Sequence, residues 1–530
     1  MTTSATNKTE AIAHKDKGNT HLLAHELDKA VEEYTIAIEL DPHNAIFYSN
    51  RAQAHIKLEN YGLAILDCDE ALKIDPSLLK AYYRKGVAQM AILKHKEALA
   101  NFKYILTKLP NDRLTLENYK QCSGYLKRQA FERAIAGADH VSVIDSVDYG
   151  AIQIEKSWQG PSVDVIKKKT GGVEITGVDL SYLKYMIDLF KKGGVLPKRH
   201  VFGIIAKCHE LFKQEQTMVE IMLPHTKLNS EKQNDEIILE NGKKLTIVGD
   251  THGQFYDVLN LFKKFGHVSE DHIYLFNGDF VDRGSWSCEV ALYLYVLKLI
   301  FPKQVFINRG NHETSDMNKT YGFADECEFK YSKKIFEAFS ESFGALPLAC
   351  LINRSYLCMH GGLFSNDQVL LSDIKAINRF PKSGSSQPPR EGLAMELLWT
   401  DPQTTNGRSP SKRGIGMQFG PDITERFCLN NKLRKIIRSH EVRMDGAESE
   451  HNGRLITVFS APNYCDATGN LGAVIHITEN QTYDVEKHDD EGYRKVDDEN
   501  CPWTLVTETF EAVEHPDMKP MAYSKGGFGF

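Results

Sequence analysis

Six residues that can bind a cation each follow a short apolar run in the second half of the chain. Runs such as "LTIV" before "GDTHG" and "VFIN" before "RGNHE" suit buried strands. The donors that they deliver are carboxylates, imidazoles and one carboxamide: Asp250, His252, Asp279, Asn311, His360 and His440. Oxygen and nitrogen donors without thiolate favour a divalent cation and argue against a structural zinc site. A pair of cations about 3.5–4 Å apart needs a shared carboxylate, which an aspartate of this set could provide.

The elements that must position these donors alternate along the chain. Short apolar runs alternate with longer apolar stretches such as "SWSCEVALYLYVLKLI", which suits a helix. An α/β domain with its site at the strand ends is therefore predicted.

Three motifs narrow this prediction. "GDTHG", "GDFVDRG" and "GNHE" occur in this order, with 29 residues from Asp250 to Asp279 and 32 from Asp279 to Asn311. This arrangement resembles the calcineurin-like metallophosphoesterases, a β-sandwich flanked by helices. Together with "MHGGL", "RSHE" and "SAPNYCD", it resembles the phosphoprotein phosphatases that act on serine and threonine. The resemblance predicts a catalytic domain over residues 181–515 and a tail over 516–530.

The resemblance implies a role for each donor in a two-metal site. One divalent cation is expected on Asp250, His252 and Asp279. The second is expected on Asp279, Asn311, His360 and His440, so that Asp279 bridges. The ions, whether manganese, iron, zinc or magnesium, would activate a water that attacks phosphorus in line.

The same resemblance assigns the remaining catalytic roles. His312 would protonate the departing oxygen, with Asp282 keeping it charged and oriented. The alternative for His312 is a packing role beside the metal ligands. Substrate phosphate would be bound by these four residues: Arg283, Arg413, Tyr464 and Asn311. A guanidinium matches two phosphoryl oxygens, although a loop arginine such as Arg413 usually faces solvent.

The first 120 residues contain an internal repeat. Pro42, Pro76 and Pro110 are spaced by 34 residues, and Ala30, Ala64 and Ala98 keep the same step. This pattern resembles three tetratricopeptide repeats over residues 8–113, in which small residues let paired helices approach. Residues 114–138 are predicted to extend the stack as a capping helix, and 139–180 to form a linker.

Five residues of the repeats resemble the carboxylate clamp of chaperone-binding tetratricopeptide domains: Lys15, Asn19, Asn50, Lys80 and Arg84. Such a set can hold a terminal carboxylate and an acidic side chain. The implied partner is the acidic C-terminus of heat-shock protein 90. A solvated basic stripe is the alternative.

A repeat domain fused to a phosphatase suggests autoinhibition. In the tetratricopeptide-containing branch of the family, the repeats cover the cleft until acidic ligands or lipids release them. The resemblance places Glu59 of "HIKLENYG" at the turn that would approach the cleft, where its carboxylate could occupy Arg283 and Arg413. A solvated turn glutamate is the alternative. The glycine-rich "SKGGFGF" end disfavours the terminal helix that helps lock the family's closed state.

Bulk composition excludes several classes. A net charge of −7 gives no global case for nucleic-acid binding, and no apolar run is long enough to span a bilayer. The first residues lack the apolar core of a signal peptide, and ten scattered cysteines suggest reduced thiols, so cytoplasm and nucleus are the expected locations. Two other functions are disfavoured. An inert adaptor is disfavoured by the intact donor set, and a metallophosphoesterase acting on nucleotides or nucleic acid is disfavoured by the "SAPNYCD" loop.

Overall fold

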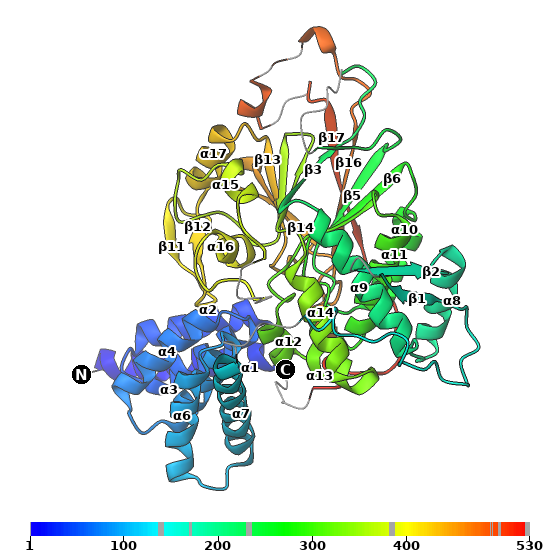
Figure 1. Cartoon of the computed structure of the whole chain (residues 1–530). Helices are drawn as coiled ribbons and strands as arrows, with labels where there is room; N and C mark the ends of the chain where they lie inside the picture. Colours follow the sequence, from blue (N-terminus) through cyan, green and yellow to red (C-terminus); the bar gives the residue numbers. More distant parts are fainter. Residues whose placement is uncertain are drawn as a thin grey trace. The chain divides into compact units, whose positions relative to one another are not determined.

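The computed structural model describes residues 2–135, 142–168, 172–228, 236–380, 387–487, 489, 491–496 and 500–524. The chain divides into two units (Figure 1). The helical unit contains residues 2–135 and Ser409–Gln418, and the catalytic unit contains most of the remaining chain. Among the described residues, no helix is long and apolar enough to cross a membrane.

The helical unit consists of three antiparallel helix pairs and a seventh helix. Their bounds are α1 (Thr2–Leu23), α2 (Leu27–Leu40), α3 (Ala45–Lys57), α4 (Tyr61–Ile74), α5 (Leu79–Ala91), α6 (His95–Lys108) and α7 (Arg113–Ile135). The repeated alanines Ala30, Ala64 and Ala98 are fully buried. At Gly86, a Cβ atom would lie 2.7 Å from the Phe102 ring, so only glycine allows α5 and α6 to approach this closely. The predicted repeat fold is confirmed.

The segment Ser409–Gln418 belongs to the helical unit although it is distant in sequence. The backbone amides of Gly62 and Leu63 donate to the Lys412 carbonyl at 2.8 and 3.2 Å. Ile415 packs against the cluster that includes Tyr61 and Ile92. The first turn of α4 therefore holds this segment by hydrogen bonds and apolar contact.

The catalytic unit contains two large mixed sheets. The five-stranded sheet has the order β17-β16-β5-β6-β7 and the seven-stranded sheet β14-β15-β13-β9-β8-β3-β4. The first comprises β5 (Lys244–Val248), β6 (His272–Phe276), β7 (Val305–Ile307), β16 (Gly472–Glu479) and β17 (Trp503–Phe510). The second comprises β3 (Met218–Met222), β4 (Ile237–Ile238), β8 (Ala349–Ile352), β9 (Tyr356–Met359), β13 (Lys435–Arg438), β14 (Ala447–Glu450) and β15 (Leu455–Val458).

The two sheets pack face to face through one apolar cluster. Ile247 and Leu275 from the five-stranded sheet meet Ile437 and Val458 from the seven-stranded sheet in this cluster. The inner strands β6, β8 and β9 are buried on both faces, so their sequences are nearly continuous apolar runs and do not alternate. The predicted sandwich is confirmed, and Figure 1 shows the strands of both sheets side by side.

Helices cover the outer faces of the sandwich. One layer packs on the five-stranded sheet: α8 (Leu180–Lys191), α9 (Lys198–Gln214), α10 (Phe255–Phe265), α11 (Ser287–Ile300), α13 (Phe323–Lys330) and α14 (Lys333–Gly344). The short helix α12 (Ser315–Tyr321) precedes α13 and contacts it. The other layer packs on the seven-stranded sheet: α15 (Leu371–Lys375), α16 (Leu393–Trp399) and α17 (Pro421–Asn430). Three short strands follow α16: β10 (Asp401–Pro402), β11 (Arg408–Pro410) and β12 (Met417–Phe419).

Residues 142–180, which lie in the predicted linker, contain a hairpin of β1 (Asp164–Lys167) and β2 (Val173–Thr176). Ile144, Tyr149 and Val165 are buried in the core of the catalytic unit. Its few apolar side chains contact distant helices such as α9, and local periodicity does not reveal such contacts. Of the predicted tail over residues 516–530, the last part, 525–530, lies outside the described residues.

Candidate active site

The predicted donors lie where strands of both sheets end. β5 ends at Val248, two residues before Asp250, and β13 ends at Arg438, two residues before His440. A bridge between Asp250 and Phe459 joins the strand ends of the two sheets, and the His440 amide donates to the Asp250 carboxylate at 3.2 Å. The sandwich therefore brings together residues from the whole length of the catalytic unit.

Four donors converge on one point. One amide atom of Asn311 lies 2.8 Å from Nε2 of His360 and 2.9 Å from both Nδ1 of His440 and Oδ2 of Asp279. Nε2 of His360 is 3.2 Å from the same Asp279 oxygen. Asp279, His360 and His440 are all buried. Lone pairs crowded this closely away from water are the arrangement that a cation satisfies, with the Asn311 oxygen facing it.

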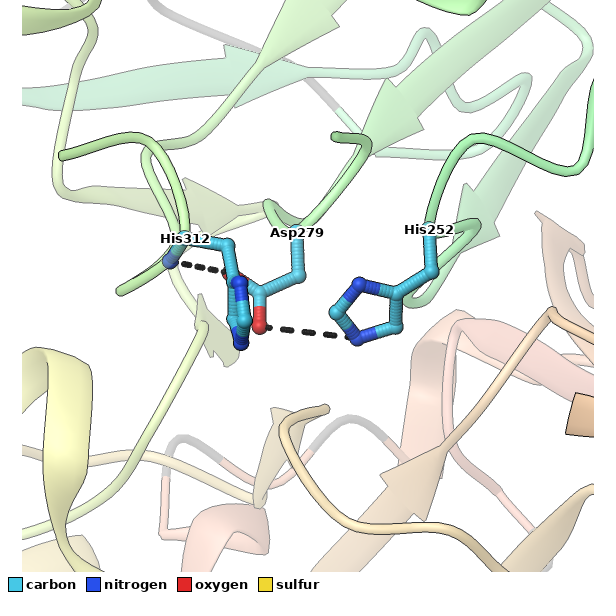
Figure 2. A group of neighbouring side chains, drawn as sticks. All are labelled: His252, Asp279 and His312. Atoms are coloured by element: carbon cyan, nitrogen blue, oxygen red, sulfur yellow. Dashed lines mark hydrogen bonds and ion pairs between the residues drawn. The ribbon is translucent and has the colours of Figure 1, made fainter. Parts of the chain in front are cut away.

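A second cluster shares Asp279. His252, Asp279 and His312 each offer a ligand atom, and these atoms lie within 4.8 Å of one another. Figure 2 shows the three side chains. Nε2 of His252 lies 3.8 Å from Oδ2 of Asp279 and 3.7 Å from Oδ2 of Asp250. His312 therefore lies as close to Asp279 as the predicted metal ligand His252 does, within the same limit. Asp279 is the residue that belongs to both clusters.

The histidine rings are fixed by backbone carbonyls. Nδ1 of His360 lies 2.9 Å from the Asn277 carbonyl, and Nδ1 of His252 lies 3.1 Å from the Val281 carbonyl. If each Nδ1 donates, the Nε2 lone pair points into the cluster, which is the tautomer of a metal ligand. Burial lowers the pKa of both rings and raises the pKa of Asp250 to about 8. Neutral imidazoles beside buried carboxylates fit divalent cations, so the residues present match the group that the fold implies.

The backbone at the strand ends is strained. His252, Asp279, Asp282, Arg283 and His440 all have positive φ angles, between 40° and 72°. This region is unfavourable for residues with a Cβ atom, and such residues cluster at functional sites. The turns that aim these side chains inward are therefore held by the surrounding structure.

A glycine makes one of these turns possible. A Cβ atom on Gly310 would lie 2.1 Å from Oδ1 of Asp279. No side chain fits between this strand end and the shared aspartate, so the motif "RGNHE" requires glycine at this position.

His312 and Asp282 form a buried pair. Nδ1 of His312 lies 2.8 Å from Oδ2 of Asp282, and Asn318 donates to the same oxygen at 2.9 Å. The Phe323 amide donates to the other oxygen at 3.0 Å. Burial raises the pKa of Asp282 to about 7, and these hydrogen bonds partly oppose the shift. The carboxylate fixes the ring so that its Nε2 is available to the site.

The predicted phosphate ligands are divided between the two units. Arg283 is buried, and its guanidinium lies 3.9 Å from the centre of the Tyr321 ring. The Tyr464 ring lies 5.1 Å from the His252 ring, beside the first cluster. Arg413 lies in Ser409–Gln418, which belongs to the helical unit. The structure therefore brings Arg283, Tyr464 and Asn311 together, whereas Arg413 belongs to the helical unit.

Three of the five predicted clamp residues are linked by hydrogen bonds. Arg84 donates to the Asn50 oxygen at 3.2 Å, and Asn50 donates to the Asn19 oxygen at 3.2 Å. These residues come from α5, α3 and α1, the first helix of each pair. Lys15 and Lys80 lie on α1 and α5. Glu59 lies in the turn between α3 and α4, with a φ of 60°.

Sequence reasoning missed the residues that support the donors. Glu313 accepts hydrogen bonds from the amides of Asp279, Phe280 and Gly310, at 2.8 to 3.0 Å. Its place at the end of "RGNHE" is the one signal that could have identified it. Arg438 binds Asp401 at 2.8 Å, and Asp401 lies 3.9 Å from Nε2 of His440. Nothing in the local sequence around Asp401 indicates this role.

Comparison with known proteins identifies the family. The profile of the calcineurin-like phosphoesterases matches residues 243–444, the tetratricopeptide repeat matches 45–78, and the region described as PPP5 TPR repeat region matches 119–220. The chain is 46% identical to serine/threonine-protein phosphatase T of Aspergillus oryzae, over 97% of this chain and 97% of that protein. The chain belongs to the serine/threonine-protein phosphatase 5/T family. It is therefore a protein phosphatase, as predicted.

Two further relatives are consistent with this family. Human serine/threonine-protein phosphatase 5 is 41% identical, over 96% of this chain and 92% of that protein. A solved structure from Saccharomyces cerevisiae, described as a protein serine/threonine phosphatase with similarity to human PP5, is 55% identical with a TM-score of 0.55. It covers 64% of this chain and 99% of that one. The phosphoesterase family implies divalent metal ions, whose identity stays open.

Proposed function

We propose that this phosphatase hydrolyses phosphoserine and phosphothreonine in proteins with two divalent cations. The observation that carries the proposal is Asp279, which belongs to both buried donor clusters. One cation would be held by Asp250, His252 and Asp279, and the other by Asp279, Asn311, His360 and His440. When bound, such a pair supplies an acidified water as nucleophile and neutralises charge on the phosphoryl oxygens.

The chain's own residues complete the reaction. Arg283 and Asn311 orient the phosphoryl oxygens, with Arg413 and Tyr464 as further contacts. His312 gives a proton to the departing serine or threonine oxygen. Asp282 holds His312 at 2.8 Å in the orientation and charge that this step needs. No side chain becomes phosphorylated in this scheme.

The test compares a phosphoserine peptide with a cyclic nucleotide and with DNA, each with manganese and with a chelator. Hydrolysis of the peptide alone, abolished by chelation, supports the proposal. Asp279→Asn should lose activity together with about two equivalents of bound metal. Full activity of a metal-free Asp279→Asn protein would refute it.

We also propose that the helical unit binds the acidic C-terminus of heat-shock protein 90. The support is the linked set of Asn19, Asn50 and Arg84, with Lys15 and Lys80 on the same helices. Such donors hold a terminal carboxylate by charge-assisted hydrogen bonds. Arg84→Ala should weaken the binding of an acidic peptide by about tenfold or more, measured by fluorescence anisotropy. Lys108→Ala on α6 is the control, and equal binding of a peptide with an amidated C-terminus would contradict the clamp.

Autoinhibition by the repeats is the third part of the proposal, with acidic lipids as further activators. It is supported by the hydrogen bonds between the first turn of α4 and Lys412, because they tie the repeat helices to the segment that carries Arg413. Glu59 lies in the turn between α3 and α4, two residues before α4 begins. Glu59→Ala should raise turnover of p-nitrophenyl phosphate, whereas Glu70→Ala should not. Unchanged turnover in a folded, metal-loaded Glu59→Ala protein would exclude Glu59.

We also propose that the protein is located in the cytoplasm and the nucleus. The support is that its ten cysteines are all free thiols. Fluorescence imaging of the tagged full chain tests this.

A further inference from the structure

A pocket lies beside the donor clusters in the catalytic unit. The open space between its lining residues, part of which is solvent, is about 370 Å³. Three of its lining residues adjoin the site in sequence: Gln254 is two residues after His252, Gly284 follows Arg283, and Cys465 follows Tyr464. A peptide whose phosphate reaches the clusters would therefore pass this pocket with a residue close to the phosphorylated one.

Aromatic rings form two walls of the pocket. Tyr256 and Trp286 meet at 5.2 Å between ring centres with an angle of 81°, and the His515 ring lies 5.0 Å from Trp286. All three residues line the pocket. Faces of tyrosine and tryptophan attract cations and also accept the methylene stem of a long side chain.

The charged residues of the pocket are mostly acidic. Asp257 is 4% exposed, and its two oxygens accept hydrogen bonds from neutral donors, the Val513 amide at 2.9 Å and the Gln254 carboxamide at 2.8 Å. Its carboxylate can accept a further, charged donor. Asp466 is more exposed and lies 3.0 Å from Nε2 of His515. His515, the partner of Asp466 on this wall, has a side chain that is 25% exposed.

One wall comes from the segment after β17. We call Glu511–Pro520 the C-terminal strap. It is held by the Val513 amide on Asp257 and by the Ser285 hydroxyl, which donates to the Lys519 carbonyl at 2.6 Å. The strap carries Glu511, Glu514 and Asp517. The strap therefore contains more acidic residues than cationic ones.

We infer that this pocket is a specificity subsite for a lysine or arginine side chain of the phosphoprotein substrate, close in sequence to the phosphorylated residue. The stem would lie along Tyr256 and Trp286, and the cation would pair with Asp257 and Asp466. The inference rests on the proposed phosphoprotein phosphatase activity and adds a sequence preference to it. An acidic side chain is disfavoured by the same carboxylates.

The test uses the full chain and a set of phosphoserine peptides built on alanine. Lysine or norleucine is placed at each of the three positions on either side of phosphoserine, since norleucine keeps the stem and removes the ammonium. At one or two positions, lysine should raise kcat/KM about tenfold over norleucine. The measured quantity is this ratio, so a general change in turnover cancels.

Variants assign the preference to the pocket. Asp466→Asn and Asp257→Asn should each reduce the ratio to about threefold or less. Asp188→Asn, which alters an exposed carboxylate on α8, should keep it. Asp466 is exposed, so its variant tests the inference even if Asp257→Asn fails to fold. Equal rates for lysine and norleucine at all six positions, or an unchanged ratio in folded Asp466→Asn and Asp257→Asn proteins, would overturn the subsite. Absence of turnover with every peptide would instead overturn the proposed function.

Discussion

The pair of His312 and Asp282 gives the sharpest prediction about catalysis. Asp282→Asn keeps the shape of the side chain but removes the negative charge, and its single carboxamide oxygen can accept from only one of the two present donors, Asn318 or the Phe323 amide. With charge centres roughly 4 Å apart and an effective dielectric constant of about 20, the lost attraction is about 4 kcal/mol. This corresponds to roughly a thousandfold lower availability of the protonated His312.

The assay separates the acid step from the rest of the reaction. A phosphoserine peptide leaves as an alkoxide and needs a proton, whereas p-nitrophenolate leaves readily without one. Asp282→Asn should therefore lower kcat for the peptide by about a thousandfold and kcat for p-nitrophenyl phosphate by less than tenfold. Metal content must be measured for both proteins, because Asp279, which belongs to both donor clusters, accepts a hydrogen bond from the His312 amide at 2.8 Å.

An equal loss with both substrates at full metal content would refute the reasoning. It would mean that Asp282 acts on substrate binding or on the metal ligands, and not through the proton on His312. Asn318→Ala is the matched comparison, because it removes a neutral donor from the same oxygen and should cost far less than the charge.

Two further predictions concern metal affinity and stability. Burial raises the pKa of Asp250 to about 8, so a proton competes with the cation below that pH, and manganese affinity measured by calorimetry should rise from pH 6.5 to 8.5. Constant affinity would contradict this. Lys330 binds Glu289 at 2.6 Å and Glu326 at 2.9 Å, all buried. Lys330→Met removes the cation from between two carboxylates and should lower the free energy of unfolding in urea by about 3–5 kcal/mol. Changing both glutamates to glutamine as well should restore part of this loss. No recovery would disprove charge burial as the cause.

Local sequence was sufficient for the repeats and for the types of donor. The 34-residue step of Pro42, Pro76 and Pro110 reflects helix packing within each repeat, which involves near neighbours in the chain. The strand-end donors were identified because apolar runs end abruptly in polar residues. The region 142–180 shows the limit of such reasoning, since Tyr149 and Val165 are buried against helices far away in sequence.

The sequence by itself determined which chemical groups are present, their order and the short elements that carry them. Only the tertiary structure decided how they meet: His440 donates to Asp250 across 190 residues, and both clusters share Asp279. It also decided the support from Glu313 and Asp401, and the pocket that the C-terminal strap completes. The physical reason is that these contacts depend on sheet pairing, left-handed turns and burial, which are set by packing of the whole unit and not by neighbouring residues.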